Sequence, residues 1–273
     1  MGDFRLNYHL GPGPYNIETR YSACGVLDDH QVRHVIWFED ALVHYGVPTV
    51  VFDLYILVED IDLAVSILAQ AGWAFDMEKP HLIGNAEVNL ADFPLQRLIS
   101  PDGQTRTILL PAADWKFPLT PDTRLEYHAP FPNLPSLRVP FPPLAGLLDA
   151  LIESWLECPN NESVLSITLA CHISYIYAHV PAVKQKSFAE QMRYEHRQFH
   201  FDVLAGMETG TLPFRRHQRV IRDALLQGQY ELRECSATRD RKELFYFLGG
   251  TKSQPVEIEL QAEDALESTE TNG

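Results

Sequence analysis

Residues 35–73 read VIWFEDALVHYGVPTVVFDLYILVEDIDLAVSILAQAGW, and this stretch decides the predicted fold. Apolar side chains recur at steps of three and four residues over 30–45, which predicts a helix that ends at Gly46. Residues 49–58 are so dense in β-branched and aromatic side chains that they predict a buried strand. A second helix is expected over residues 61–71, where a glycine follows. The stretch therefore predicts the order helix, buried strand, helix.

Asp53 stands in the middle of the expected strand, where a carboxylate is costly unless it faces a cleft or a partner. The preceding helix carries Glu39 and Asp40. Glu39 is expected to approach Asp53 and form a carboxylate pair that binds a metal ion or a cationic group, such as a guanidinium or an amine. The acidic residues at 59–62 are interpreted as solvated charges at the start of the second helix. The predicted catalytic residues are Asp53, Glu39, Asp40 and Tyr55.

This order and spacing resemble the minimal nucleotidyltransferase superfamily, which includes antitoxin-type and antibiotic-modifying enzymes. In that family a helix opens with Gly-Gly or Gly-Ser, another Gly follows eight residues later, and an Asp-x-Asp strand begins seven residues after that. Counting from Gly46 places Phe38 and Glu39 at the Gly pair and Asp53 at the first carboxylate. The resemblance implies an α+β fold with a nucleotidyltransferase-like mixed sheet, flanking helices and a cleft that handles nucleotides.

The metal-binding residues of that family are only partly matched. In the family, two carboxylates on the strand and a third on a neighbouring strand hold the divalent ions that carry the nucleotide triphosphate. Tyr55 occupies the position of the second carboxylate, and the neighbouring strand, expected over 105–110, offers Thr107 or Ile108. Only Asp53 remains, so no metal or other cofactor is expected. Magnesium enters only if the chain is a true metal-dependent nucleotidyltransferase.

Length and composition allow two modest domains, because 273 residues with 45% hydrophobic content bury a sizeable core. A hairpin is expected over 95–110 beside the Asp53 strand, and the proline-rich residues 129–143 predict a connection. The predicted segments are an N-terminal arm (1–29) with a turn or short strand near 21–26, a nucleotidyltransferase-like domain (30–128), the connection (129–143), a mainly helical domain (144–250) and an acidic disordered or loosely docked tail (251–273). Helices of the second domain are expected at about 144–156, 162–179, 187–205 and 215–227.

The helical domain carries the predicted phosphate-binding residues. The net charge of the chain is −15, but residues 184–243 carry 12 basic and 9 acidic side chains. Arginines recur at helical spacing in two places, and guanidinium groups bind phosphate in a bidentate manner. The predicted substrate- or phosphate-binding residues are Arg193, Arg197, His200, Arg215, Arg216, Arg219 and Arg222. The alternative is a solvated face whose arginines pair with nearby acids.

Several other classes of protein lack support in the sequence. It contains no Walker loop, no G-x-S-x-G and no G-x-G-x-x-G motif, and its four cysteines form no C-x-x-C pair. His196 and His200 lie one helical turn apart without a third ligand at obvious spacing, so no metal site is predicted. The uncharged residues 163–183 include two histidines and are interpreted as a buried helix instead of a membrane span. A cytoplasmic protein without a membrane partner is expected.

Three functions are compatible with these features. The favoured one is a metal-independent, repurposed transferase acting on a nucleotide- or RNA-linked substrate, for example in aminoacyl-tRNA-dependent dipeptide or cyclodipeptide formation with a cationic amino acid. The chain also resembles proteins of filamentous fungi, in which clusters for small metabolites make such chemistry plausible. The alternatives are a non-catalytic nucleotide- or ligand-binding pseudoenzyme and a metal-dependent nucleotidyltransferase. The partners expected are a nucleotide or tRNA end and a small cationic substrate.

Overall fold

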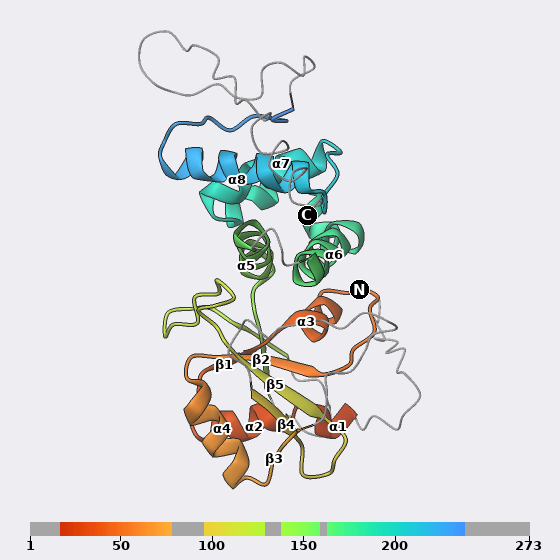
Figure 1. Cartoon of the computed structure of the whole chain (residues 1–273), viewed down its shortest axis with the longest axis vertical. Coiled ribbons are helices and arrows are strands. Elements are labelled where there is room, and N and C mark those ends of the chain that lie inside the picture. The colour runs from red at the N-terminus through yellow and green to blue at the C-terminus, as the bar shows by residue number, and fades with distance from the viewer. Residues whose placement is uncertain (1–16, 78–95, 129–137, 159–162, 238–273) are drawn as a thin grey trace, which may run out of the picture. The chain divides into compact units, whose positions relative to one another are not determined.

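The computed structural model of the chain is a mixed α/β structure with a helical C-terminal part (Figure 1). It describes residues 17–77, 96–128, 138–158 and 163–237. The chain divides into two compact units, residues 1–192 and residues 193–273. The first unit holds a five-stranded mixed sheet with flanking helices, as expected. The more specific nucleotidyltransferase fold stays a prediction.

The sheet has the strand order β1-β2-β5-β4-β3. β2 runs parallel to β5, whereas the other neighbouring strands pair antiparallel. The strands are β1 (His34–Ile36), β2 (Leu54–Val58), β3 (Ala74–Phe75), β4 (Gln96–Ile99) and β5 (Arg106–Pro111). β4 and β5 form the expected hairpin, and β5 lies directly beside β2.

Helices cover both faces of the sheet (Figure 1). On one face α2 (Ser22–Asp29) packs against α4 (Ile61–Gln70), which contacts β5. On the other face α3 (Phe38–His44) packs on β2 and against α6 (Ser163–His179). Because both faces are covered, the central strands are apolar nearly throughout, which explains the continuous apolar run of β2.

The expected helix over 30–45 is wrong in its first half. His34–Ile36 form β1, which pairs with β2, and the helix begins only at Phe38. Buried apolar residues such as Val35 and Ile36 satisfy a strand buried on both faces as well as a helix, so periodicity alone does not separate the two. The helix ends before Gly46, which has a φ of 85°. β2 begins at Leu54, so Asp53 precedes the strand instead of lying in its middle.

The N-terminal arm is also corrected, because the described part of residues 1–29 is helical. α1 covers Ile17–Arg20, and α2 replaces the turn or short strand expected near 21–26. α2 buries Ala23, Cys24 and Leu27 against the domain, so these residues belong to the core. Burial also raises the pKa of the Cys24 thiol well above its ordinary value, which removes thiolate character.

The proline-rich connection contains a strand. β7 (Val139–Phe141) pairs with β6 (Glu126–His128) in a separate two-stranded sheet, and Pro140 is accommodated because such a sheet has only edge strands. Residues 129–137, which hold most of the connection, lie outside the described residues. β7 also contacts β1, so this segment packs against the five-stranded sheet.

The C-terminal helices agree with the sequence in part. α5 (Leu144–Glu157) and α6 were expected, but both fall in the first compact unit, since the chain divides only after Met192. The helix expected over 187–205 is broken at its start. The 3-10 helices η2 (Lys186–Gln191) and η3 (Tyr194–His196) and the α-helix α7 (Arg197–Leu204) replace it, and η1 (Pro181–Lys184) precedes them.

α8 (Leu212–Leu226) is the last helix in the described part of the second unit. In its first turn, the N–H of Phe214 donates to the Thr211 hydroxyl. Among the described helices, none combines the length with the apolar character needed to cross a bilayer. The expected acidic tail at 251–273 lies outside the described residues.

His34 makes the stability of the first unit depend on pH. Its ring is buried and its Nδ1–H donates to the Val32 carbonyl at 2.9 Å; burial lowers the pKa of His34, although this bond and Asp28 act in the opposite direction. The folded state therefore favours neutral His34. Stability from this residue is present above the unfolded-state pKa of about 6.5 and is lost as the pH falls through the lower folded-state value.

We expect the free energy of unfolding to decrease between about pH 7.5 and about pH 5, and to decrease less in His34→Asn, whose amide N–H still donates to Val32. Urea denaturation of both proteins at the two pH values measures the difference. An equal decrease in wild type and variant would contradict this role of His34.

Candidate functional site

The strand register gathers polar residues on the face of the sheet that α3 covers. Tyr55 in β2 pairs with Ile108 in β5, which pairs with Arg97 in β4. Because paired residues on neighbouring strands point to the same face, Tyr55 and Arg97 share this face. Arg106 lies two residues before Ile108 in β5 and shares this face by strand alternation, and Asp53, directly before β2, lies beside it. The sheet therefore places two arginines beside the predicted Asp53 and Tyr55.

Arg106 joins two carboxylates on this face. Its Nη1 lies 3.8 Å from Oδ1 of Asp53, and its Nε donates to Oδ2 of Asp76, the residue after β3. The side chain of Arg106 is only 9% exposed, and those of Asp53 and Asp76 are 11% and 5% exposed. Charges so well covered persist only when paired, so the guanidinium and the two carboxylates stabilise one another.

Tyr55 lies in the field of this charged cluster. Burial and the negative charges of Glu39 and Asp53 raise the pKa of the Tyr55 phenol well above its ordinary value, although Arg97 and Arg106 oppose the shift. The phenol is therefore neutral near pH 7 and offers an O–H donor. The structure thus brings three of the predicted residues together, namely Glu39, Asp53 and Tyr55.

Glu39 faces α6 as well as this cluster. Its Oε1 lies 3.6 Å from Nε2 of His172, while its Oε2 is buried and makes no hydrogen bond within the described residues. The ring of Phe38 packs on His172, Tyr55 and Trp115, with centroid distances of 5.3, 4.9 and 4.9 Å. The carboxylate of Glu39 therefore lies beside an aromatic cluster.

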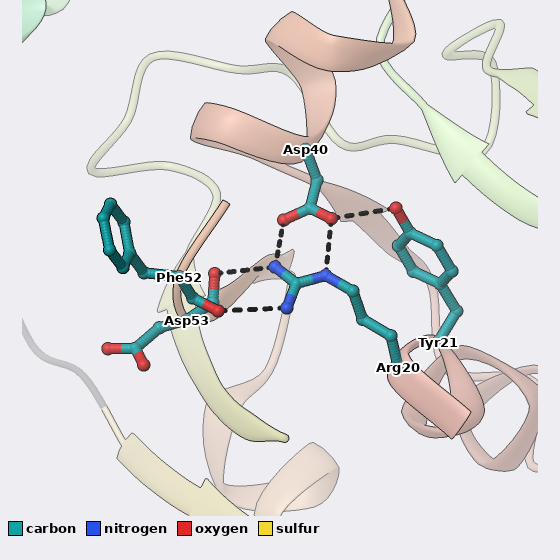
Figure 2. Close-up of polar contacts among 5 residues, drawn as sticks. All are labelled: Arg20, Tyr21, Asp40, Phe52 and Asp53. Carbon is teal, nitrogen blue, oxygen red and sulfur yellow. Dashed lines mark hydrogen bonds and ion pairs between the residues drawn. The ribbon is translucent and has the colours of Figure 1, made fainter. Parts of the chain in front are cut away.

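Asp40 points to a different place from Glu39 (Figure 2). Its two oxygens accept from Nε and Nη2 of Arg20 at 2.8 and 2.6 Å, and the Tyr21 hydroxyl donates to Oδ1 at 2.8 Å. Arg20 also donates to the backbone carbonyls of Phe52 and Asp53. Figure 2 shows the Asp53 carboxylate turned away from Arg20. The structure therefore gives Asp40 a positioning role instead of the predicted catalytic one.

An open cavity of about 860 Å³ lies at the other ends of β2 and β5, beside the start of α4. The acidic residues at 59–62 line it together with Arg33 and Asp114. Asp60 caps α4 by accepting from the N–H of Leu63 at 3.0 Å, as expected for charges at a helix start. None of the predicted catalytic residues lines this cavity.

Three of the predicted phosphate-binding residues of the second unit are buried, which neither a phosphate-binding stripe nor the alternative of a solvated face predicts. Arg215, Arg222 and His200 are 1%, 6% and 0% exposed. On α8 the arginines share the buried face with Gln218 and Leu225, one turn apart, and this placement makes them core residues. Arg216 and Arg219 are half-buried.

The remaining two predicted arginines have local partners. Arg193 pairs with Glu195 at 2.7 Å, and the Arg197 guanidinium lies 5.5 Å from the centroid of the Tyr194 ring.

Asp202 organises the second unit from its interior. It is 0% exposed and accepts from the side-chain amides of Gln198 and Gln218 and from the N–H and Oγ of Ser236. The Ser236 hydroxyl gives its one proton to Asp202, so His217, whose Nε2 lies 2.7 Å away, acts as donor to Ser236. Ser236 is 1% exposed, and the network ties its segment to α7 and α8.

Sequence reasoning missed Arg97, Arg106, Asp76 and His172. Arg97 and Arg106 are the charged residues of β4 and β5, and a cross-strand pairing of the predicted hairpin would have placed them on one face. His172 is the buried polar residue of an apolar helix. In the described parts of the chain, no three His, Cys, Asp or Glu side chains gather in a way that would hold a metal ion.

We expect Asp40→Asn to lower the free energy of unfolding by about 3 kcal/mol, because it leaves the buried Arg20 guanidinium without its bidentate anion. Urea denaturation measures the change. Asp122→Asn is the matched control, since Asp122 is exposed and its substitution should cost less than about 0.5 kcal/mol. Equal losses in both variants would contradict the positioning role of Asp40.

Comparison of the sequence with known proteins found no relative of this chain. The chain matches no protein-family model, and no curated protein is significantly similar to it in sequence. Interpretation of the site therefore depends on the residues described above.

Proposed function

We propose that the chain is a nucleotidyltransferase-type scaffold in which a fixed guanidinium, that of Arg106, stands in for the divalent metal, and that it serves as a non-catalytic nucleotide- or ligand-binding module. The observation that carries this proposal is the contact of Arg106 with both Asp53 and Asp76. Asp53 is the residue at which the family pattern places the first metal-binding carboxylate. The module is expected to act in the cytoplasm, on a nucleotide or an RNA end.

The backbone at the start of α3 supports the scaffold. Phe38 has a φ of 51°, in the left-handed region that glycine favours and that a bulky side chain rarely adopts. Phe38 is the residue that stands at the first glycine of the family pattern. The left-handed conformation is therefore retained where the glycine itself is replaced, which is what we expect if the loop geometry is inherited.

The chemistry of the cluster disfavours metal-dependent transfer. A divalent ion at Asp53 would lie close to the guanidinium of Arg106, and like charges repel strongly in a poorly solvated site. Tyr55 and Ile108 occupy the positions expected for the second carboxylate and, by the observed register, for the third. Neither side chain is an anion that would balance the charge of a metal ion.

The arginines of the sheet face suit an anionic ligand. Arg97 and Arg106 lie on the same face, and guanidinium groups hydrogen-bond phosphate through two parallel N–H groups. The two guanidinium groups would contribute N–H donors to a nucleotide phosphate at this face, beside the carboxylates of Asp53 and Asp76.

The metal-independent transferase is the second candidate, and one observation favours it. Glu39, His172 and the neutral Tyr55 phenol lie near one another and are residues that act as general acids and bases. Incubation with aminoacyl-tRNAs followed by mass spectrometry tests it. A new dipeptide or cyclodipeptide that Glu39→Gln abolishes would support transfer and overturn the non-catalytic assignment.

We expect the purified protein to bind ATP without a divalent ion and to incorporate no nucleotide when magnesium or manganese is added. Arg106→Gln should weaken ATP binding about tenfold, which corresponds to about 1.4 kcal/mol, while Arg106→Lys should weaken it less because it keeps the charge. Isothermal titration measures binding, and labelled ATP measures transfer. Metal-dependent nucleotidylation that Asp53→Asn abolishes would overturn the proposal.

A further inference from the structure

The carboxylate of Glu39 is unusual among the covered acids of the first unit. Asp40, Asp53 and Asp76 each pair with a guanidinium, at distances of up to 3.8 Å, whereas the partner of Glu39 is an imidazole at 3.6 Å. Its Oε2 is buried and makes no hydrogen bond within the described residues. A buried carboxylate oxygen without a hydrogen-bond donor destabilises the folded state, so a bound cation or strong hydrogen-bond donor would stabilise this site.

The surroundings of Glu39 favour an organic cation. Phe38, the preceding residue, packs on the rings of His172, Tyr55 and Trp115, so the carboxylate lies beside an aromatic cluster. Aromatic faces attract ammonium and guanidinium groups, and a desolvated carboxylate adds a charge-assisted hydrogen bond. The Tyr55 phenol is neutral, so it adds no competing anion.

His172 supports the same conclusion. Its ring is 5% exposed, and its Nδ1 makes no hydrogen bond within the described residues. The distance of 3.6 Å from its Nε2 to Glu39 is too long for a good hydrogen bond. The imidazole is therefore a weak internal partner, which a ligand with a full positive charge and several N–H donors can displace.

We propose that Glu39, with the aromatic cluster of Phe38, Tyr55 and Trp115, binds the primary ammonium or guanidinium group of a small organic cation, which displaces the imidazole of His172. The side chain of Glu39 is 13% exposed, so part of it is accessible from solvent. The inference rests on the proposed function in one respect. It assumes that the ligand bound at this sheet face has an anionic and a cationic part, and it assigns the cationic part to Glu39. The anionic part would lie toward Arg97 and Arg106.

The test uses butylamine and butylguanidine as probes and butanol as the uncharged control, with isothermal titration on the full chain. Both cations should bind, and butanol should not. Glu39→Gln should weaken cation binding at least about tenfold. The matched control is Glu59→Gln, because Glu59 is exposed and away from the cluster, and it should leave the affinity unchanged.

A second variant keeps the test decisive if Glu39→Gln fails to fold. His172→Gln removes the internal competitor, and it should tighten cation binding several-fold. Equal binding of butylamine and butanol, or a His172→Gln variant that binds cations no better than wild type, would overturn the cation site. ATP binding is measured separately, without amines. Failure to bind ATP would contradict the proposed function, whereas failure to bind the amines would contradict only the cation site.

Discussion

The arrangement of the sheet face depends on the buried guanidinium of Arg106. It connects the residue that precedes β2 with the residue that follows β3, and it does so from β5, which lies between them in the sheet order. Removing any one of the three charges would leave the others covered and poorly compensated. The alternation of β5 points Arg106 to this face, so the charge pattern follows directly from the register of the strands.

A second arginine fixes the same site from the other side. Arg20 holds Asp40 in a bidentate pair and donates to the carbonyls of Phe52 and Asp53, so it anchors the backbone that Asp53 belongs to (Figure 2). Arg106 engages the Asp53 side chain, and Arg20 engages its main chain. The neighbouring residues Glu39 and Asp40 consequently have different roles, since successive positions of a helix point about 100° apart.

The parts of the fold that were predicted correctly are those with strong local signals. α4 and the β4–β5 hairpin have clear apolar runs bounded by glycine or a turn, and α5 has a continuous apolar face. β1 was mistaken for helix because buried strands and helices share apolar runs. The arginines of α8 were expected to form a phosphate-binding stripe, yet Arg215 and Arg222 lie on its buried face, which only tertiary packing determines.

The candidate site was predicted only in part for a similar reason. Asp53, Glu39 and Tyr55 belong to one local stretch, and their meeting follows from its helix-and-strand order. Arg106 and Asp76 come from strands distant in sequence, and their contact depends on a register that no local pattern specifies. The role of Asp40 could not be predicted, because its partner Arg20 belongs to a segment that was expected to be irregular.

The central claim is that a guanidinium occupies the place of a metal ion at Asp53, and a manganese titration followed by electron paramagnetic resonance tests it most directly. The account predicts that wild type and Asp53→Asn bind manganese equally weakly. A manganese site in the wild type that Asp53→Asn removes would contradict it.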